Sequence, residues 1–277
     1  MSEVASAPAG AVAGAAACCE ETPPAPAGAG TGAAPRRWRD GAIVLGGLGG
    51  VTVLAWLYVA GQTGAIGGVG GGMHAMGGLA LGFTVSMWVV MMAGMMLPSA
   101  APMVVTFDAL SRRQPGHLWR TATFVGAYLG VWALFSVLGA CAQLTLRSAG
   151  LVSAAGAATP LLAAGLLLGA GFYQLSPLKD ACLRGCRTPL AFLLTEWRPG
   201  ARGAATMGLR HGVECVVCCW GIMALMFVLG TMDLVWMAAL TLVMLVEKTV
   251  PGGDRVGRAA GIACLVFGGA WLMRVMI

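Results

Sequence analysis

Seven long apolar segments constrain this chain more than any other feature of its sequence. A helix needs about 20 apolar residues to cross the hydrocarbon core of a bilayer. The seven segments that approach or reach this length are residues 41–61, 79–106, 118–142, 158–176, 205–229, 232–248 and 257–276. Only 10% of the 277 residues are charged, against about 25% in a soluble domain. The sequence therefore predicts an all-α transmembrane bundle of about seven helices and excludes ordinary cytosolic enzyme classes.

The shortest segment, 232–248, leaves open a six-helix arrangement with one half-inserted segment. The second segment contains Pro98 and Pro102, which predict a kinked or re-entrant inner end. Four glycine pairs have the small-xxx-small spacing that lets helices approach closely in lipid, and this favours a compact bundle. They are Gly46/Gly50, Gly126/Gly130, Gly165/Gly169 and Gly257/Gly261.

The basic residues predict the orientation of the bundle. In a soluble chain, a pI near 9.0 would suggest a nucleic-acid partner, but in a membrane protein Lys and Arg first mark the cytoplasmic loops. With the N-terminus inside, all of the 17 basic residues except Arg147 and Arg274 fall on the inner side. We therefore expect a multi-pass protein of the cell inner membrane, with the C-terminus outside. Its partner would be the lipid bilayer, with no nucleic acid.

The chain divides into two parts by composition. Residues 1–40, rich in Ala, Pro and Gly, predict a disordered cytosolic tail, and residues 41–277 predict the transmembrane helical domain. The tail contains the vicinal pair Cys18-Cys19, for which we expect no metal role. Most of the nine cysteines lie in apolar runs or in predicted cytosolic loops, so a secreted disulfide framework is not expected.

The fifth apolar segment carries a set of metal-ligand side chains. Helical spacing places His211, Cys215 and Cys218 on one face, with Glu214 beside them and Cys219 following. Cys215 and Cys218 would lie about 15–20 Å deep, near the middle of a bilayer. A carboxylate at that depth needs a cavity, a cation or a partner. The alternative is that the cysteines are small packing residues.

The second apolar segment carries a methionine stripe. Met87, Met91 and Met95 repeat every four residues, with Met92 and Met96 alongside. Counted from the outer helix ends, this stripe shares a depth with Cys218. If the two helices meet, thioethers, thiols and one imidazole would form a site that suits Cu(I), with zinc as the runner-up. The alternative is again packing, since methionine fills irregular core gaps.

Two further groups of possible ligands lie in predicted loops. Cys182 and Cys186 are four residues apart in the large inner loop, where Lys179, Arg184 and Arg187 would favour the thiolate form. This pair could bind a metal or act as a thiol pair. Met73, His74 and Met76 lie in a glycine-rich outer loop and could capture a soft cation at the outer face, but with so few ligands a simple linker is favoured.

The remaining charged residues near helix ends are expected to be interfacial anchors. These are Asp108, Asp233, Glu247 and Lys248. No nucleotide-binding GxxxxGK[ST], zinc-protease HExxH or hydrolase GxSxG motif occurs. The sequence therefore gives no support for an ATP-driven pump or a hydrolase.

Three separated motifs resemble a known family. They are the string from Met87 to Pro102, the stretch from Tyr173 to Arg187, and Cys215 to Trp220 followed by Glu247-Lys248. In this order they resemble a bacterial family of predicted metal-binding integral membrane proteins of unknown function, over roughly residues 80–275. The resemblance implies a polytopic membrane protein with a metal role and no established reaction.

Three functional hypotheses follow from the sequence. The first is a membrane protein that binds and moves or delivers a soft metal ion, copper before zinc, in which a metallochaperone or a membrane complex is a possible partner. Its metal residues would be Cys215, Cys218 and Cys219 with Met91, Met92, Met95 and Met96, while His211, Glu214, Cys182 and Cys186 assist. The second is a thiol-disulfide oxidoreductase, and the third is a non-catalytic subunit of a membrane assembly.

Overall fold

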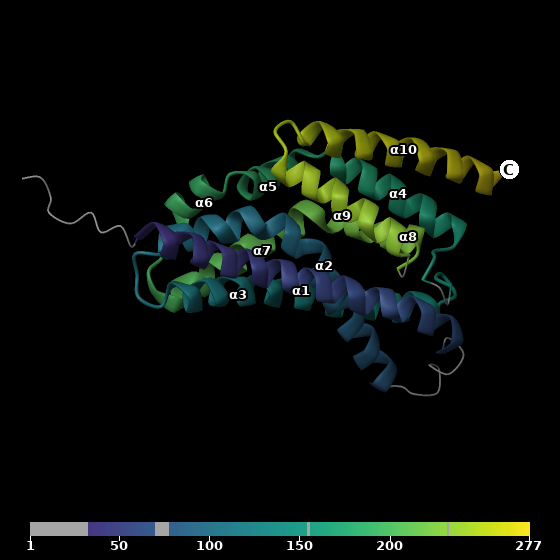
Figure 1. Ribbon diagram of the computed structural model, residues 1–277. Coiled ribbons are helices and arrows are strands. Elements are labelled where there is room, and N and C mark those ends of the chain that lie inside the picture. The colour runs from purple at the N-terminus through teal and green to yellow at the C-terminus, as the bar shows by residue number, and fades with distance from the viewer. Residues whose placement is uncertain (1–32, 70–77, 154–155, 232) are drawn as a thin grey trace, which may run out of the picture.

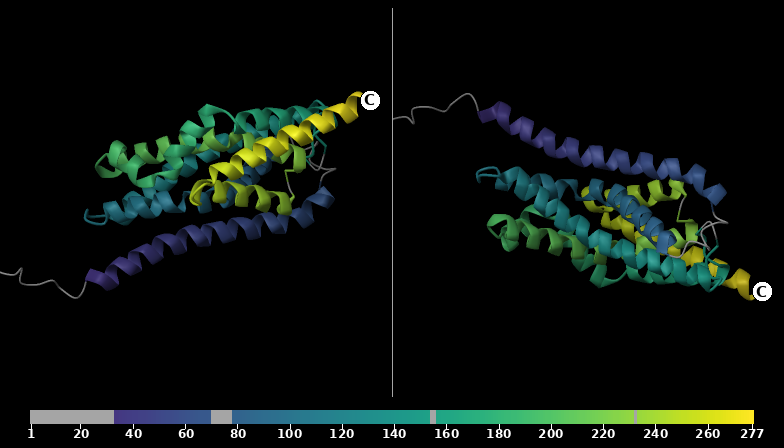
Figure 2. Two further views of the ribbon diagram at one scale, coloured as in Figure 1. Left: turned by 90° about the horizontal axis from the view of Figure 1, so that it is seen from above. Right: turned by 90° about the horizontal axis from the view of Figure 1, so that it is seen from below.

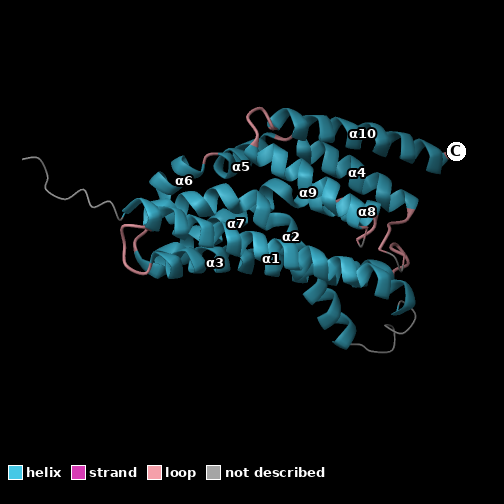
Figure 3. Ribbon diagram, in the orientation of Figure 1, coloured by secondary structure: helices cyan, strands magenta, loops and turns pink. Residues whose placement is uncertain are grey.

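The computed structural model describes residues 33–277 except 70–77, 154–155 and 232. The described residues form ten helices, and their only β-structure is the isolated bridge between Val152 and Ala158. The helices are α1 (Ala33–Val69), α2 (Gly78–Ser111), α3 (His117–Ser148), α4 (Pro160–Gln174), α5 (Pro177–Arg187), α6 (Pro189–Glu196), α7 (Gly200–Ala224), α8 (Met226–Leu229), α9 (Leu234–Thr249) and α10 (Asp254–Met276). The predicted all-helical class is confirmed (Figure 3).

Two segments for which the sequence made predictions, the N-terminal tail and the glycine-rich outer loop, lie partly or wholly outside the described residues. The predicted disordered tail lies outside the described residues up to residue 32, whereas its last part, residues 33–40, belongs to α1. This part is rich in Ala and Arg, which favour helix. Cys18-Cys19 and the trio Met73, His74 and Met76 lie outside the described residues.

Five of the described helices are long and apolar enough to cross a membrane. They are Gly41–Gln62 of α1, Leu81–Ser111 of α2, His117–Ser148 of α3, Gly200–Leu229 of α7 with α8, and Asp254–Met276 of α10. A sixth arises if α4 and α5 count as one span that bends by 64°. The seven-span arrangement stays a prediction, because α9 has only 16 residues.

The bend between α4 and α5 has a local cause in the sequence. Ser176 caps the new helix, because its hydroxyl accepts a hydrogen bond from the Lys179 backbone N–H at 3.3 Å. Pro177 follows at the first helical position, where its missing N–H costs nothing. The segment around Cys182 and Cys186, predicted as a loop, is therefore a helix.

The helices pack side by side in one bundle (Figures 1 and 2). α7 packs against α3 and α5, α3 packs against α2, and α4 packs against α10. α1 packs on α2 at the outer edge of the bundle and is mostly exposed on its other sides. The largest buried cluster joins side chains from α2, α3, α5, α7 and α9. α7 therefore contributes to the main buried core of the protein.

α2 continues through both of its prolines to Ser111. Pro98 has no N–H, so the carbonyl of Gly94, four residues earlier, loses its partner within the helix. The Trp56 indole N–H of α1 donates to this carbonyl at 3.3 Å. A methyl group at Gly94 would lie 3.1 Å from Ala55 Cβ, so glycine permits this close approach. The prolines predicted a kinked or re-entrant inner end, and the re-entrant form is not observed, because α2 continues as one helix and a neighbouring helix satisfies the freed carbonyl.

Glycine spacing brings α7 against α3. A methyl group at Gly212 would lie 2.9 Å from Val131 Cβ, and one at Gly208 would collide with the Phe124 carbonyl oxygen. Of the four glycine pairs singled out in the sequence, Gly257/Gly261 makes such contacts. The other three pairs meet nothing within 4 Å, so their spacing reflects the high glycine content.

We predict that Gly208→Ala destabilises the bundle. Alanine in a helix is intrinsically better than glycine by up to about 1 kcal/mol, but here its methyl group forces α7 away from the α3 backbone. Overpacking of this kind costs about 1–3 kcal/mol. This cost outweighs the gain in helix propensity, so the substitution is destabilising overall. Thermal unfolding of the detergent-solubilised protein should show a lower Tm. Gly130→Ala is the matched control, because Gly130 has open space around it; equal Tm values for the two variants would contradict the packing account.

Candidate metal centre

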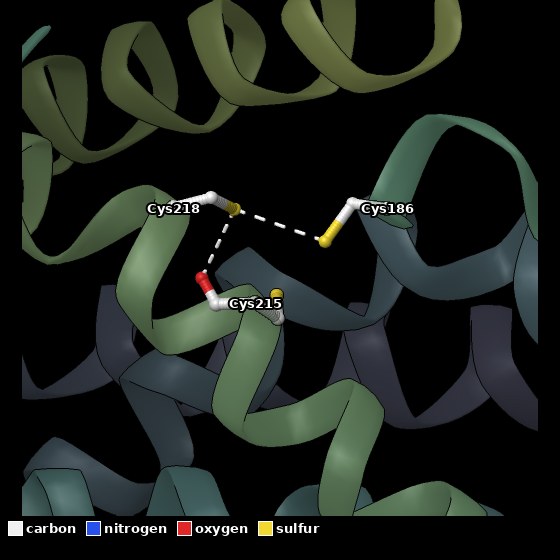
Figure 4. A group of neighbouring side chains, drawn as sticks. All are labelled: Cys186, Cys215 and Cys218. Carbon is white, nitrogen blue, oxygen red and sulfur yellow. Dashed lines mark hydrogen bonds between the residues drawn. The ribbon is translucent and has the colours of Figure 1, made fainter. Parts of the chain in front are cut away.

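Three buried thiols from two helices converge in the core. Cys186 of α5 and Cys215 and Cys218 of α7 have their Sγ atoms within 4.8 Å of one another. Cys186 Sγ and Cys218 Sγ are 3.8 Å apart and point toward each other (Figure 4). Thiolates bind a metal such as zinc at about 2.3 Å, so ligands of one ion lie up to about 4.6 Å apart. Small side-chain rotations would therefore let these three thiols share one ion.

Cys218 lies at the centre of a group of four buried thiols. Its Sγ lies 3.3 Å from Cys219 Sγ and donates to the Cys215 carbonyl oxygen at 3.2 Å. Cys219 is 2% exposed and adds a fourth sulfur at the edge of the group. We call Cys186, Cys215, Cys218 and Cys219 the thiol cluster. Helical spacing alone places three of these residues together, and the fourth, Cys186, comes from α5.

The methionine stripe of α2 belongs to the same buried core as the thiol cluster. Met91, Met92, Met95 and Met96 are each at most 1% exposed, and they belong to the largest buried cluster together with the thiols. The Tyr128 hydroxyl of α3 joins the two: it donates to the Met96 carbonyl at 3.4 Å and lies 3.3 Å from Cys215 Sγ. The sequence left open whether these two helices meet. α2 and α7 are not among the helix pairs that pack extensively against each other, and Tyr128 of α3 bridges them.

Other predicted ligands lie beside the thiol cluster and outside the group that could share one ion. His211 is buried one turn before Cys215, with its ring stacked on Tyr128 at 5.5 Å between centroids. Its Nδ1 is buried and has no hydrogen-bond partner. Glu214 is half-buried and accepts from the Arg210 Nε at 3.4 Å. Cys182 is half-buried and packs at the edge of the same core.

Lys248 is the residue that sequence reasoning placed differently. It was expected to be an interfacial anchor, but its Nζ donates to Cys215 Sγ at 3.0 Å and to Ser99 Oγ at 3.4 Å. Only 6% of Lys248 is exposed. An ammonium group at this distance stabilises a thiolate. The available signal was a lysine at the end of a segment that is otherwise apolar apart from Glu247.

Lys179 also has a different role from the one predicted. It was expected to favour thiolates at Cys182 and Cys186, but it forms a buried ion pair with Glu247 of α9. Gly257 of α10 covers this pair, and a methyl group there would lie 3.1 Å from Lys179 Nζ. The pair fixes α5, which carries Cys186, to α9, which carries Lys248. Both charges are satisfied, as buried charges must be.

The fold and the site define a helical protein whose apolar core holds a cluster of thiols suited to a soft metal ion. A family model described as PpoB2, copper chaperone, matches residues 85–271. This is more than half of the chain, so the chain belongs to the PpoB2 copper chaperone family. The matched region includes the methionine stripe, the whole thiol cluster and Lys248, and it omits α1. Neither the curated proteins nor the solved structures contain a significant match.

We predict that Cys186→Ser weakens metal binding at the same site as Cys218→Ser. Loss of one thiolate from a shared site should lower the Cu(I) affinity at least about 10-fold, because even mutation of a residue that only hydrogen-bonds to a metal ligand lowers affinity by this factor. Competition with a chromogenic Cu(I) chelator measures this affinity on detergent-purified protein. Cys141→Ser is the control, because Cys141 is exposed on α3. An unchanged affinity in Cys186→Ser would remove α5 from the site.

Proposed function

We propose that this protein is a membrane-embedded copper chaperone that holds Cu(I) at the thiol cluster and moves or delivers it. The observation that carries the proposal is the convergence of Cys186, Cys215 and Cys218 within 4.8 Å in a buried core. Membership of a copper chaperone family supports copper as the cargo. Five to six apolar helices support a membrane location.

The donor atoms favour Cu(I) over zinc. Thiolates and thioethers are soft ligands, and Cu(I) is the common metal that prefers them. Within the described residues, the group that could share one ion contains cysteines and no carboxylate or imidazole. Zinc accepts thiolates as well, so it remains the runner-up. The buried methionines of α2 belong to the same core as the thiols, and their thioether sulfur is also a soft ligand.

We assign roles by position relative to the thiol cluster. Cys186, Cys215 and Cys218 hold the ion, and Cys219 and the methionines surround it. His211, one turn along α7, would accept the ion on its way to the inner face, and Cys182 at the edge of the core would exchange it with a metallochaperone. The basic-residue pattern supports a multi-pass protein of the cell inner membrane with the N-terminus inside. With no energy-coupling motif recognised, movement would be passive or part of a larger assembly.

A vesicle assay tests delivery across or from the membrane. Purified protein is placed in liposomes that enclose a Cu(I) chelator, and Cu(I) is added outside. The initial rate at which the enclosed chelator changes colour reports Cu(I) entry. With the Cys215→Ser/Cys218→Ser variant we expect this rate to fall to the value for protein-free vesicles, because the ion then has no binding site in the core. Cys141→Ser should match the wild type. Equal rates for the double variant and the wild type would contradict transfer through the thiol cluster.

A second candidate function is thiol-disulfide exchange, which the sulfur distances favour. Cys218 Sγ lies 3.8 Å from Cys186 Sγ and 3.3 Å from Cys219 Sγ. Formation of a disulfide would release two protons and pass two electrons to the disulfide of a partner protein.

Thiol trapping distinguishes this second function from metal binding. If the protein is an oxidoreductase, an oxidised dithiol protein should convert two thiols to a disulfide, and a reduced one should restore them. Labelling with a maleimide reagent of known mass counts the free thiols on a denaturing gel. The Cys141→Ser variant should behave as the wild type does. A constant number of free thiols throughout would reject the redox function.

A further inference from the structure

Lys248 is a buried cation whose partners are unusual. It lies in the last turn of α9, and its neighbour Glu247 is already paired with Lys179. In the part of the chain that the structure describes, no carboxylate pairs with Lys248. Its hydrogen-bond partners are Cys215 Sγ and Ser99 Oγ. The positive charge therefore faces the thiol cluster without an acidic side chain to neutralise it.

The surroundings of Lys248 come from three helices. Ser99 of α2 and Cys215 of α7 contact its ammonium group directly, and Tyr128 of α3 lies on Cys215. None of these side chains carries a fixed negative charge, whereas a buried ammonium group is costly unless a negative charge compensates it. The sulfur of Cys215, in its thiolate form, is the one group in contact with Lys248 that can supply it.

A metal ion bound to Cys215 would also lie close to Lys248. A metal–thiolate bond of about 2.3 Å added to the Lys248 Nζ–Cys215 Sγ distance of 3.0 Å places such an ion no more than about 5.3 Å from the ammonium nitrogen. Coulomb repulsion is proportional to the charge of the ion. The repulsion from Lys248 therefore makes the binding free energy of a divalent ion less favourable by twice as much as that of a monovalent ion.

We propose that Lys248 is a charge filter that makes the thiol cluster select Cu(I) over divalent ions such as Zn(II). This inference rests on the proposed function, in which the thiol cluster binds a soft metal. Thiolates alone attract a divalent ion more strongly than a monovalent one, and the ammonium group opposes that preference. The sign of the effect does not depend on whether two or three thiolates bind the ion. Lys248 thus determines specificity without being a ligand.

The test compares metal selectivity in variants of detergent-purified protein. Affinities for Cu(I) and for Zn(II) are each measured by competition with a chromogenic chelator, and their ratio is the readout. Lys248→Met keeps the length of the side chain and removes its charge, so the ratio should shift toward Zn(II) by on the order of 100-fold. Lys248→Arg keeps the charge and should retain a ratio close to that of the wild type.

Two controls separate selectivity from folding and from total charge. Arg255→Met removes one positive charge from an exposed site on α10 and should leave the ratio unchanged. If Lys248→Met does not survive purification, Lys248→Gln replaces it, because the amide can still donate to Cys215 and Ser99.

The outcomes distinguish this inference from the proposed function. A shift toward Zn(II) in the neutral variants but not in Lys248→Arg or Arg255→Met supports the charge filter. An unchanged ratio in a neutral variant that still binds both metals overturns the charge filter and leaves the proposed function intact. A wild-type protein that binds neither metal overturns the proposed function and the charge filter together.

Discussion

The close contact of α7 with α3 is the interaction on which the rest of the structure depends. Gly208 and Gly212 let the α7 backbone approach Phe124 and Val131 of α3, because neither glycine has a side chain to keep the helices apart. This approach turns the face that carries Cys215 and Cys218 toward the core. It also brings the Tyr128 hydroxyl to Cys215. The thiol cluster therefore follows from a glycine contact on the same helix, one to two turns earlier.

Glu247 and Lys248 are consecutive residues of α9 and make different charged contacts in the core. Glu247 pairs with Lys179 of α5, whereas Lys248 contacts Cys215 of α7. Consecutive residues on a helix point in different directions, so α9 holds both of its neighbours through charge. Buried ion pairs contribute little net stability, because desolvation offsets their attraction. Their value here is positional, since they fix the helix that carries Cys186 and direct a cation at the thiol cluster.

Hydropathy and helical spacing predict much of the fold and part of the site. Each of the seven apolar segments contains a helix, and the spacing of His211, Cys215 and Cys218 correctly predicts one shared, buried face of α7. Cys186 was predicted as a possible ligand, but local spacing cannot predict that it joins Cys215 and Cys218, because its position depends on the 64° bend that follows Gln174. Nor can it predict Lys248, which enters the site because α9 ends beside Ser99. A charged residue near a helix end has the same sequence pattern whether it faces lipid headgroups or a buried sulfur.

The composition of the core separates two properties that a metal site needs. The methionines provide soft sulfur that is always neutral, so any number of them can surround an ion without altering the charge of the core. The thiols provide soft sulfur that becomes negative on binding. The net charge around an ion bound at the proposed site would therefore be set by the thiols and by Lys248. The thioethers of Met91, Met92, Met95 and Met96 in the same core would not alter this charge. A methionine-rich core with few cysteines, and with Lys248 in contact with Cys215, would thus permit binding of a soft ion at low total charge, which a low-dielectric interior requires.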